Sequence, residues 1–302
     1  MTLARGVLAA VLAALTPLVW TEEPAAQGRQ RSLYVSAVDA TGKPVSDLGT
    51  RDFVVKEDNL TREILRVTPA EEPMQVAVLV DTSQAARDAI AHMREALPTF
   101  VTELTAPNEA GRKNQIAIIG IGERPTILSE YSSNSSVVQK GIDRIWAYPG
   151  SGMYLLDAII DVSRGLMKRE AERPILVTIA TEGADFSNRY HDQALDPLKE
   201  AGAAFYALMI GQPDTSLRPE SRERAIVLDT GPLSTGGYRE QLLTSLALKP
   251  RLAELANQLT HQYRVTYSRP ESLIPPEHIT VSSSRPGVTA RGTPVRERQV
   301  LK

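Results

Sequence analysis

Apolar and polar residues follow two different patterns along this chain, and the change between them divides it. In residues 32–67, short stretches such as LYVSAV and DFVVKED alternate apolar and polar positions, with the turn signal ATGKPV between them. This pattern predicts a small antiparallel β unit. From Met74 to about Tyr267, continuous apolar runs alternate with helical segments, which is typical of βαβ units. We therefore expect an α/β fold, with a doubly wound, mostly parallel sheet preceded by a β-rich lead-in.

The apolar runs of the second region predict its strands, and 3.6-residue spacing predicts its helices. Ile90, Met93 and Leu97 begin one such helical stripe. Residues 216–240 are polar and rich in Arg, Glu, Gly and Pro, and they predict a surface loop. The expected strands are 75–80, 115–121, 174–180, 203–210 and 263–267, and the further helices are 154–168, 191–201 and 251–261.

Both ends of the chain differ from its middle. Arg5 precedes an apolar run from Gly6 to Trp20 and then the small residues of TEEPAAQG, a pattern typical of a signal peptide over residues 1–27. The run is short for a membrane span, and no other stretch is long and apolar enough to be one. After residue 267 a strand is expected at 278–282, and the basic tail from Arg285 is expected to be solvated. The chain thus divides into 1–27, a lead-in at 32–70, an α/β domain at 74–268, and a C-terminal β segment with a basic tail at 269–302.

Composition excludes several classes of function. The N-terminal pattern leads us to expect an exported protein, periplasmic, cell-surface or secreted. The chain of 302 residues has no cysteine, which excludes disulfides, thiol catalysis and thiolate metal sites. A formal net charge of -2 argues against a nucleic-acid binder. No nucleophile motif occurs, and Gly120 and Gly122 lack the third glycine of a dinucleotide loop. We expect neither catalytic residues nor an organic cofactor.

The stretch MQVAVLVDTS, residues 74–83, predicts the candidate site. An apolar run typical of a buried parallel strand ends in Asp81, and Ser83 follows two residues later. Open α/β sheets place their sites at this end of the strands, and a carboxylate beside a hydroxyl suits a hard cation. A second hydroxyl would complete the pattern at position 85, where the chain has Ala85. The residues leave open a metal-dependent binding module and one that has lost its metal, in which Asp81 only caps a helix or binds loop N–H groups.

Several segments, in order, resemble the von Willebrand factor A family, specifically its exported bacterial group. The match covers most of the chain after residue 27, and the order of the motifs is more specific than any one of them. The segments are SLYVSAVDATGKPVSDLGTRDFVVKED, MQVAVLVDTS, QIAIIGIGERPTIL, YPGSGMYLLDAI, ILVTIATEGAD, STGGYRE and HQYRVTYSRP.

The resemblance implies a degenerate metal-ion-dependent adhesion site. The family's Asp and first Ser fall on Asp81 and Ser83, its second Ser on Ala85, its Thr on Met153 and its last Asp on Glu182. Ala85 has no oxygen, and the Met153 thioether is a poor ligand for a hard cation. The implied cofactor is Mg²⁺, held by Asp81, Ser83 and Glu182 and completed by an acidic side chain of a protein partner.

The sequence therefore predicts a non-enzymatic, adhesion-type protein-binding module of the bacterial envelope or cell surface. Its binding loops are 81–85, 150–153 and 181–185, at the C-terminal ends of the sheet strands. Two alternatives remain. One is a hydrolase that uses the acidic cluster Asp81, Glu182 and Asp185. The other is a structural envelope protein whose strand at 33–38 adds to another protein's sheet edge.

Overall fold

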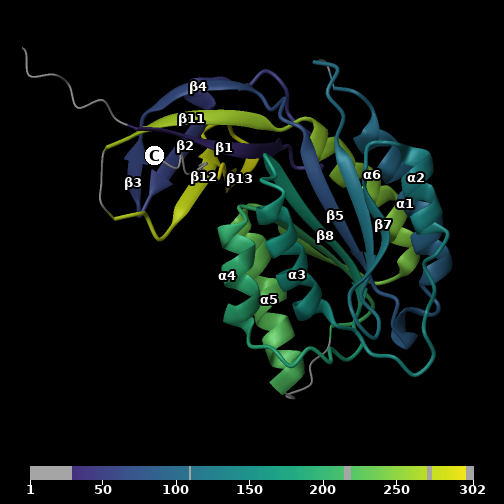
Figure 1. Cartoon of the computed structure of the whole chain (residues 1–302). Helices are drawn as coiled ribbons and strands as arrows, with labels where there is room; N and C mark the ends of the chain where they lie inside the picture. The colour runs from purple at the N-terminus through teal and green to yellow at the C-terminus, as the bar shows by residue number, and fades with distance from the viewer. Residues whose placement is uncertain (1–28, 109, 214–218, 271–273, 297–302) are drawn as a thin grey trace, which may run out of the picture.

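A helix-flanked parallel sheet and an assembly of two antiparallel sheets make up the protein (Figure 1). The computed structural model describes residues 29–296 except 109, 214–218 and 271–273. The predicted signal peptide at 1–27 and residues 297–302 of the predicted tail lie outside the described residues. In the described part, no helix is both long and apolar enough to cross a membrane.

The central sheet has the strand order β10-β9-β8-β5-β6-β7. Adjacent strands in it are parallel, except that the edge strand β7 pairs antiparallel with β6. This confirms the predicted doubly wound α/β fold. The apolar run of β5 is buried from Val76 to Val80 because helices cover both faces of the sheet. Its strands are β5 (Met74–Val80), β6 (Gln115–Gly120), β7 (Thr126–Ser132), β8 (Arg173–Thr181), β9 (Ala204–Ile210) and β10 (Tyr238–Leu242).

Two layers of helices bury the two faces of this sheet (Figure 1). Alternate β5 side chains divide between them: Val76 and Val78 pack with α1, α2 and α6, whereas Ala77 and Leu79 pack with α3, α4 and α5. The helices are α1 (Ile90–Thr105), α2 (Ser135–Ile142), α3 (Leu155–Lys168), α4 (His191–Glu200), α5 (Pro219–Thr235) and α6 (Leu248–Thr260), with short 3-10 turns at Thr50–Asp52, Gln84–Ala86 and Ser245–Ala247.

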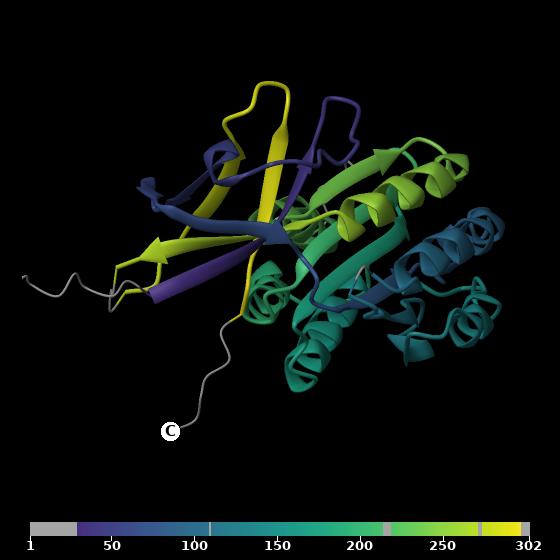
Figure 2. The same ribbon diagram turned by 90° about the horizontal axis from the view of Figure 1, so that it is seen from above.

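The lead-in and the C-terminal segment fold together into the antiparallel sheets, which lie to one side of the parallel sheet (Figure 2). One sheet has the order β13-β1-β11-β4 and the other β12-β2-β3. Leu33, Val35, Val265 and Phe53 belong to the core that they share. The strands are β1 (Arg29–Val38), β2 (Phe53–Glu57), β3 (Leu60–Arg62), β4 (Ile64–Pro69), β11 (Tyr263–Arg269), β12 (Ile279–Ser283) and β13 (Thr289–Pro294).

The structure corrects three expectations. The strand expected at 263–267 exists as β11, but it pairs antiparallel with β1 and β4 instead of joining the parallel sheet. An apolar run in the sequence does not specify which strand it will pair with.

The tail expected to be solvated contains β13, which pairs with β1 across residues 289–294. The loop expected at 216–240 is mostly the helix α5 followed by β10. Gly231 and Pro232 near the end of α5 hide its helical pattern, although Val227 and Leu228 are buried.

Arg173 joins the two parts of the molecule. It is the first residue of β8 and is buried, and its guanidinium donates to the Gln262 side chain and to the carbonyls of Leu259 and Ala70. The same group lies 5.3 Å from the centre of the Tyr34 ring. Burial lowers the pKa of Arg173 to about 10, so it stays charged at neutral pH. The antiparallel sheets therefore pack at the N-terminal ends of the parallel strands, away from the loops at the opposite edge.

Candidate functional site at the C-terminal edge of the parallel sheet

The three predicted loops meet at the C-terminal edge, joined by backbone hydrogen bonds. The Tyr148 N–H donates to the Thr82 carbonyl at 2.9 Å, which ties the segment before α3 to the loop after β5. The Met153 N–H donates to the Ala184 carbonyl at 3.1 Å, and the Phe186 N–H donates to the Met153 carbonyl at 2.7 Å. The Gln84 N–H donates to the Ser151 carbonyl at 3.2 Å, so loop 150–153 is tied to the loops on both sides of it.

Asp81 is the buried centre of this arrangement. One carboxylate oxygen accepts the Ser83 N–H at 2.8 Å. The other accepts the Thr181 N–H at 3.0 Å and the Thr181 hydroxyl at 2.6 Å. Three donors therefore stabilise the buried carboxylate, and Asp81 holds together loops that are 100 residues apart in sequence. This is the loop-binding role that the residues left open beside the metal role.

The Ser83 and Ala85 side chains lie against the third loop. Among the described residues, the buried Ser83 hydroxyl has no hydrogen-bond partner. A Cβ added to Gly183 would lie 2.7 Å from the Ala85 Cβ and 3.8 Å from the Ser83 Oγ. The Gly183 backbone therefore closes directly on the Ala85 methyl, and position 183 has no room for a side chain.

Glu182 turns toward basic and amide groups. Its Oε2 lies 3.0 Å from Arg224 Nη2. Its Oε1 lies 3.1 Å from Gln241 Nε2 and 3.5 Å from Arg239 Nη2. Arg224 also donates to the Gly183 carbonyl. Sequence reasoning missed both arginines because they lie on α5 and β10, within the segment expected to be a loop.

Asp185 and Met153 have structural roles. Asp185 Oδ1 accepts the Ser187 N–H at 2.7 Å, and its Oδ2 accepts the Leu155 N–H at 3.2 Å, which caps the start of α3. Burial raises the pKa of Asp185 to about 6. Met153 is fully buried in the core beneath α3. The three carboxylates of the suspected acidic cluster thus take separate partners, and among the described residues no group of three or more His, Cys, Asp or Glu is placed to hold a metal.

These side chains, as arranged, do not fit a magnesium ion. Magnesium requires oxygen ligands in near-octahedral geometry. The Asp81 oxygens already accept three hydrogen bonds, Glu182 faces two arginines, and position 85 has only a methyl group. Ser83 alone among these keeps a buried oxygen without a partner in the described residues. The metal assignment of Asp81, Ser83 and Glu182 stays a prediction.

Exposed aromatic side chains surround the same loops. Among the described residues, the exposed aromatics are Trp146, Tyr148, Phe186 and Tyr190, which we call the aromatic surface. Trp146 is 59%, Phe186 57% and Tyr190 70% exposed. All four lie in the segments before α3 and before α4, at the C-terminal edge. The two pairs are separated in sequence, so no local pattern predicted that they would share an edge.

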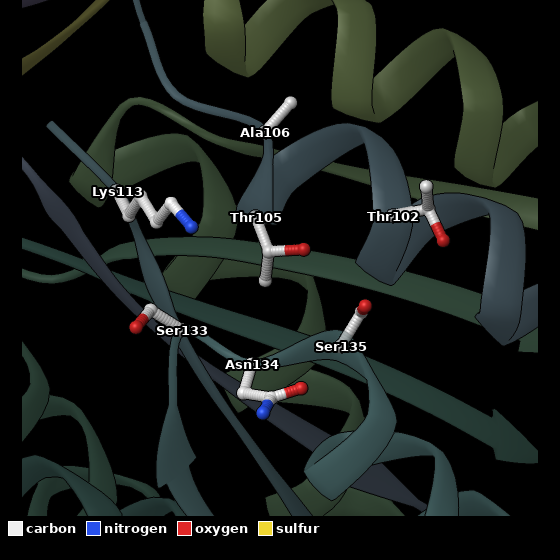
Figure 3. A pocket seen from close by; sticks show the side chains of 7 residues that line it. All are labelled: Thr102, Thr105, Ala106, Lys113, Ser133, Asn134 and Ser135. Atoms are coloured by element: carbon white, nitrogen blue, oxygen red, sulfur yellow. The ribbon is translucent and has the colours of Figure 1, made fainter. Parts of the chain in front are cut away.

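A polar pocket lies elsewhere, at the N-terminal edge of the parallel strands (Figure 3). The edge follows from the pairing of Ser132 with Ile116, next to the start of β6. Two of its polar side chains serve the backbone: the Thr105 hydroxyl donates to Val101, and Asn134 accepts the Ser136 N–H. The pocket is therefore separate from the candidate site. Its lining residues are Thr102, Thr105, Ala106, Lys113, Ser133, Asn134 and Ser135.

Comparisons with known proteins identify the fold. Neither protein-family models nor curated proteins give a match to the sequence. Among solved structures, a von Willebrand factor type A protein from Catenulispora acidiphila aligns with a TM-score of 0.50 at 10% identity, over 91% of this chain and 74% of that one. Proximal thread matrix protein 1 from the mussel byssus aligns with a TM-score of 0.50 at 14% identity, over 67% of this chain and 50% of its own, so the match spans half of the mussel protein. The vWF domain of the pilus tip protein Mfa5 from Porphyromonas gingivalis aligns with a TM-score of 0.48 at 9% identity, over 63% and 96% of the two chains. The sheet order, the helix layers and the two matches with a TM-score of 0.50 show that the chain has the fold of von Willebrand factor A domains.

Proposed function

We propose that the protein is an exported, non-enzymatic protein-binding module of the adhesion type, which binds its partner on the loops at the C-terminal edge without needing a metal ion. The aromatic surface carries this proposal. Single exposed apolar residues are ordinary, but the exposed aromatics of the described chain gather on one edge. Tryptophan and tyrosine are enriched among the residues that dominate the energy of protein interfaces.

Neighbouring residues contact two side chains of the aromatic surface and hold them in position. The Arg94 guanidinium lies 4.1 Å from the centre of the Trp146 ring. The Phe186 ring lies directly on Gly152, where an added Cβ would be 1.7 Å from the ring, and 6.4 Å from the Tyr154 ring. Side chains that are positioned before binding lose less conformational entropy when the partner arrives. This supports the edge as a preformed binding surface.

The alternatives have less support. A hydrolase would need an acid and a base in one arrangement, but Asp81, Glu182 and Asp185 bind separate loop and arginine groups. A structural role through residues 33–38 required an open strand edge. That edge is covered, because β1 pairs with β11 on one side and with β13 on the other. The covered edge counts against this alternative.

A capture experiment with matched variants tests the proposal. The protein without residues 1–27 is immobilised and exposed to secreted and surface proteins of its source organism, with EDTA or with magnesium. We expect Trp146→Ala and Phe186→Ala to lose a protein that the wild type retains in both buffers. Leu65→Ala, an exposed position on β4, is the control and should retain it. Equal capture by all variants, or capture only with magnesium, would contradict the proposal.

A further inference from the structure

A positive charge within the chain already occupies the oxygens of the third loop. The Arg224 guanidinium bonds the Glu182 carboxylate, at 3.0 Å, and the Gly183 carbonyl. Carboxylate and backbone carbonyl oxygens are the groups that such a loop would offer to a hard cation. Arg224 therefore makes with these residues the contacts that a bound cation would otherwise make.

The contact is buried and has several supporting bonds. The side chains of Arg224 and Glu182 are 3% and 10% exposed. Gln241 and Arg239 reach the second Glu182 oxygen from β10, and Arg239 in turn binds Asp229 at 2.6 Å. Further hydrogen bonds help to offset the cost of burying an ion pair, and here Gln241 and Arg239 supply them to Glu182. Solvent ions therefore compete poorly for the Glu182 oxygens.

We propose that Arg224 is an internal cation that takes the place of a divalent ion at the C-terminal edge and excludes it. The guanidinium holds the loop after β8 against α5, and Asp81 is satisfied by hydrogen-bond donors. Removal of Arg224 leaves the Glu182 carboxylate and the Gly183 carbonyl without this cation, as oxygen ligands that an added ion could use.

Thermal unfolding with manganese and magnesium tests this exclusion. The wild-type melting temperature should not change with millimolar ion. Arg224→Gln should melt lower without metal and recover with manganese in a saturable way, because an ion that binds only the native state stabilises it. Adding Glu182→Gln, which removes the carboxylate that Arg224 binds, should remove that recovery. Calorimetric titration of the same proteins should show heat only for Arg224→Gln.

Two control variants keep the result interpretable. Arg269→Gln removes another arginine beside a buried carboxylate, 3.4 Å from Glu57 in the antiparallel sheets, and should melt lower with no response to metal. Arg224→Lys keeps the charge and should also not respond. If Arg224→Gln does not fold, its refolding in manganese replaces the melt, and recovery is expected. Metal binding by the wild type, or no response of Arg224→Gln by either readout, would overturn the proposal.

Discussion

The Asp81 carboxylate accepts both the backbone N–H and the hydroxyl of Thr181, at 3.0 and 2.6 Å. The two residues end neighbouring parallel strands, and their bonds fix the loops that follow each strand. In this motif, which is typical of metal binding, the hydrogen bonds of Asp81 join two loops to each other. We therefore treat the C-terminal edge as a preformed surface.

Asp81→Ala is expected to destabilise the protein strongly. The change leaves the Ser83 N–H, the Thr181 N–H and the Thr181 hydroxyl without their buried acceptor, at a cost of about 1–3 kcal/mol for each unsatisfied group. We expect a total loss of about 3 kcal/mol or more in urea unfolding, the same in EDTA and in magnesium. Thr181→Val removes only the hydroxyl and should cost about 1 kcal/mol. A loss seen in magnesium and absent in EDTA would mean that Asp81 acts through an ion.

Gly183→Ala is expected to destabilise the protein through one contact, with Ala85. The new Cβ would lie 2.7 Å from the Ala85 Cβ, and such overpacking costs about 1–3 kcal/mol. Ala85→Gly removes the opposing methyl, so the double variant should recover most of the loss in a double-mutant cycle. Gly165→Ala on α3, where nothing lies within 4 Å, is the control and should stabilise by about 0.5–1 kcal/mol. Additive losses at positions 183 and 85 would show that the loops do not touch there.

Arg173→Met is expected to loosen the junction between the two parts of the molecule. It leaves the Gln262 side chain and the Leu259 and Ala70 carbonyls without their buried donor. We expect a loss of about 3 kcal/mol and faster proteolysis in the antiparallel sheets. Arg169 is exposed and lies over the Tyr131 ring, so Arg169→Met is the control. It should change the free energy of unfolding by less than about 0.5 kcal/mol. An effect of Arg173→Met no larger than this would contradict the junction role.

Asp185 makes stability depend on pH in a defined direction. Burial raises its pKa from 3.8 to about 6, so the folded state holds this proton more tightly than the unfolded state. Its contribution is fully present below pH 3.8 and is lost as the pH rises through about 6. The wild type should lose about 3 kcal/mol from this group over that interval, and Asp185→Asn should lose less, by urea unfolding at pH 4 and pH 7. Parallel pH profiles would show that Asp185 has an ordinary pKa.

The sequence predicts the sheet better than it predicts the site. The apolar run that ends at Asp81 identifies β5 and the edge where the loops meet, because burial of both sheet faces requires such a run. The partners of Glu182 were not predictable, since Arg224 and Arg239 come from distant segments that the tertiary fold brings together. Trp146 and Phe186 share an edge for the same reason, and β11 shows that an apolar strand can belong to either sheet.

Hydroxyl-radical footprinting of the captured complex, carried out in EDTA, distinguishes a partner bound at the C-terminal edge from one bound elsewhere on the protein. It measures the solvent accessibility of each aromatic side chain with and without the partner. We expect protection of Trp146, Tyr148, Phe186 and Tyr190, with no change at Leu60 and Leu65 in the antiparallel sheets. Unchanged aromatic residues together with protection at Leu60 or Leu65 would place the partner on the antiparallel sheets and contradict binding at the C-terminal edge.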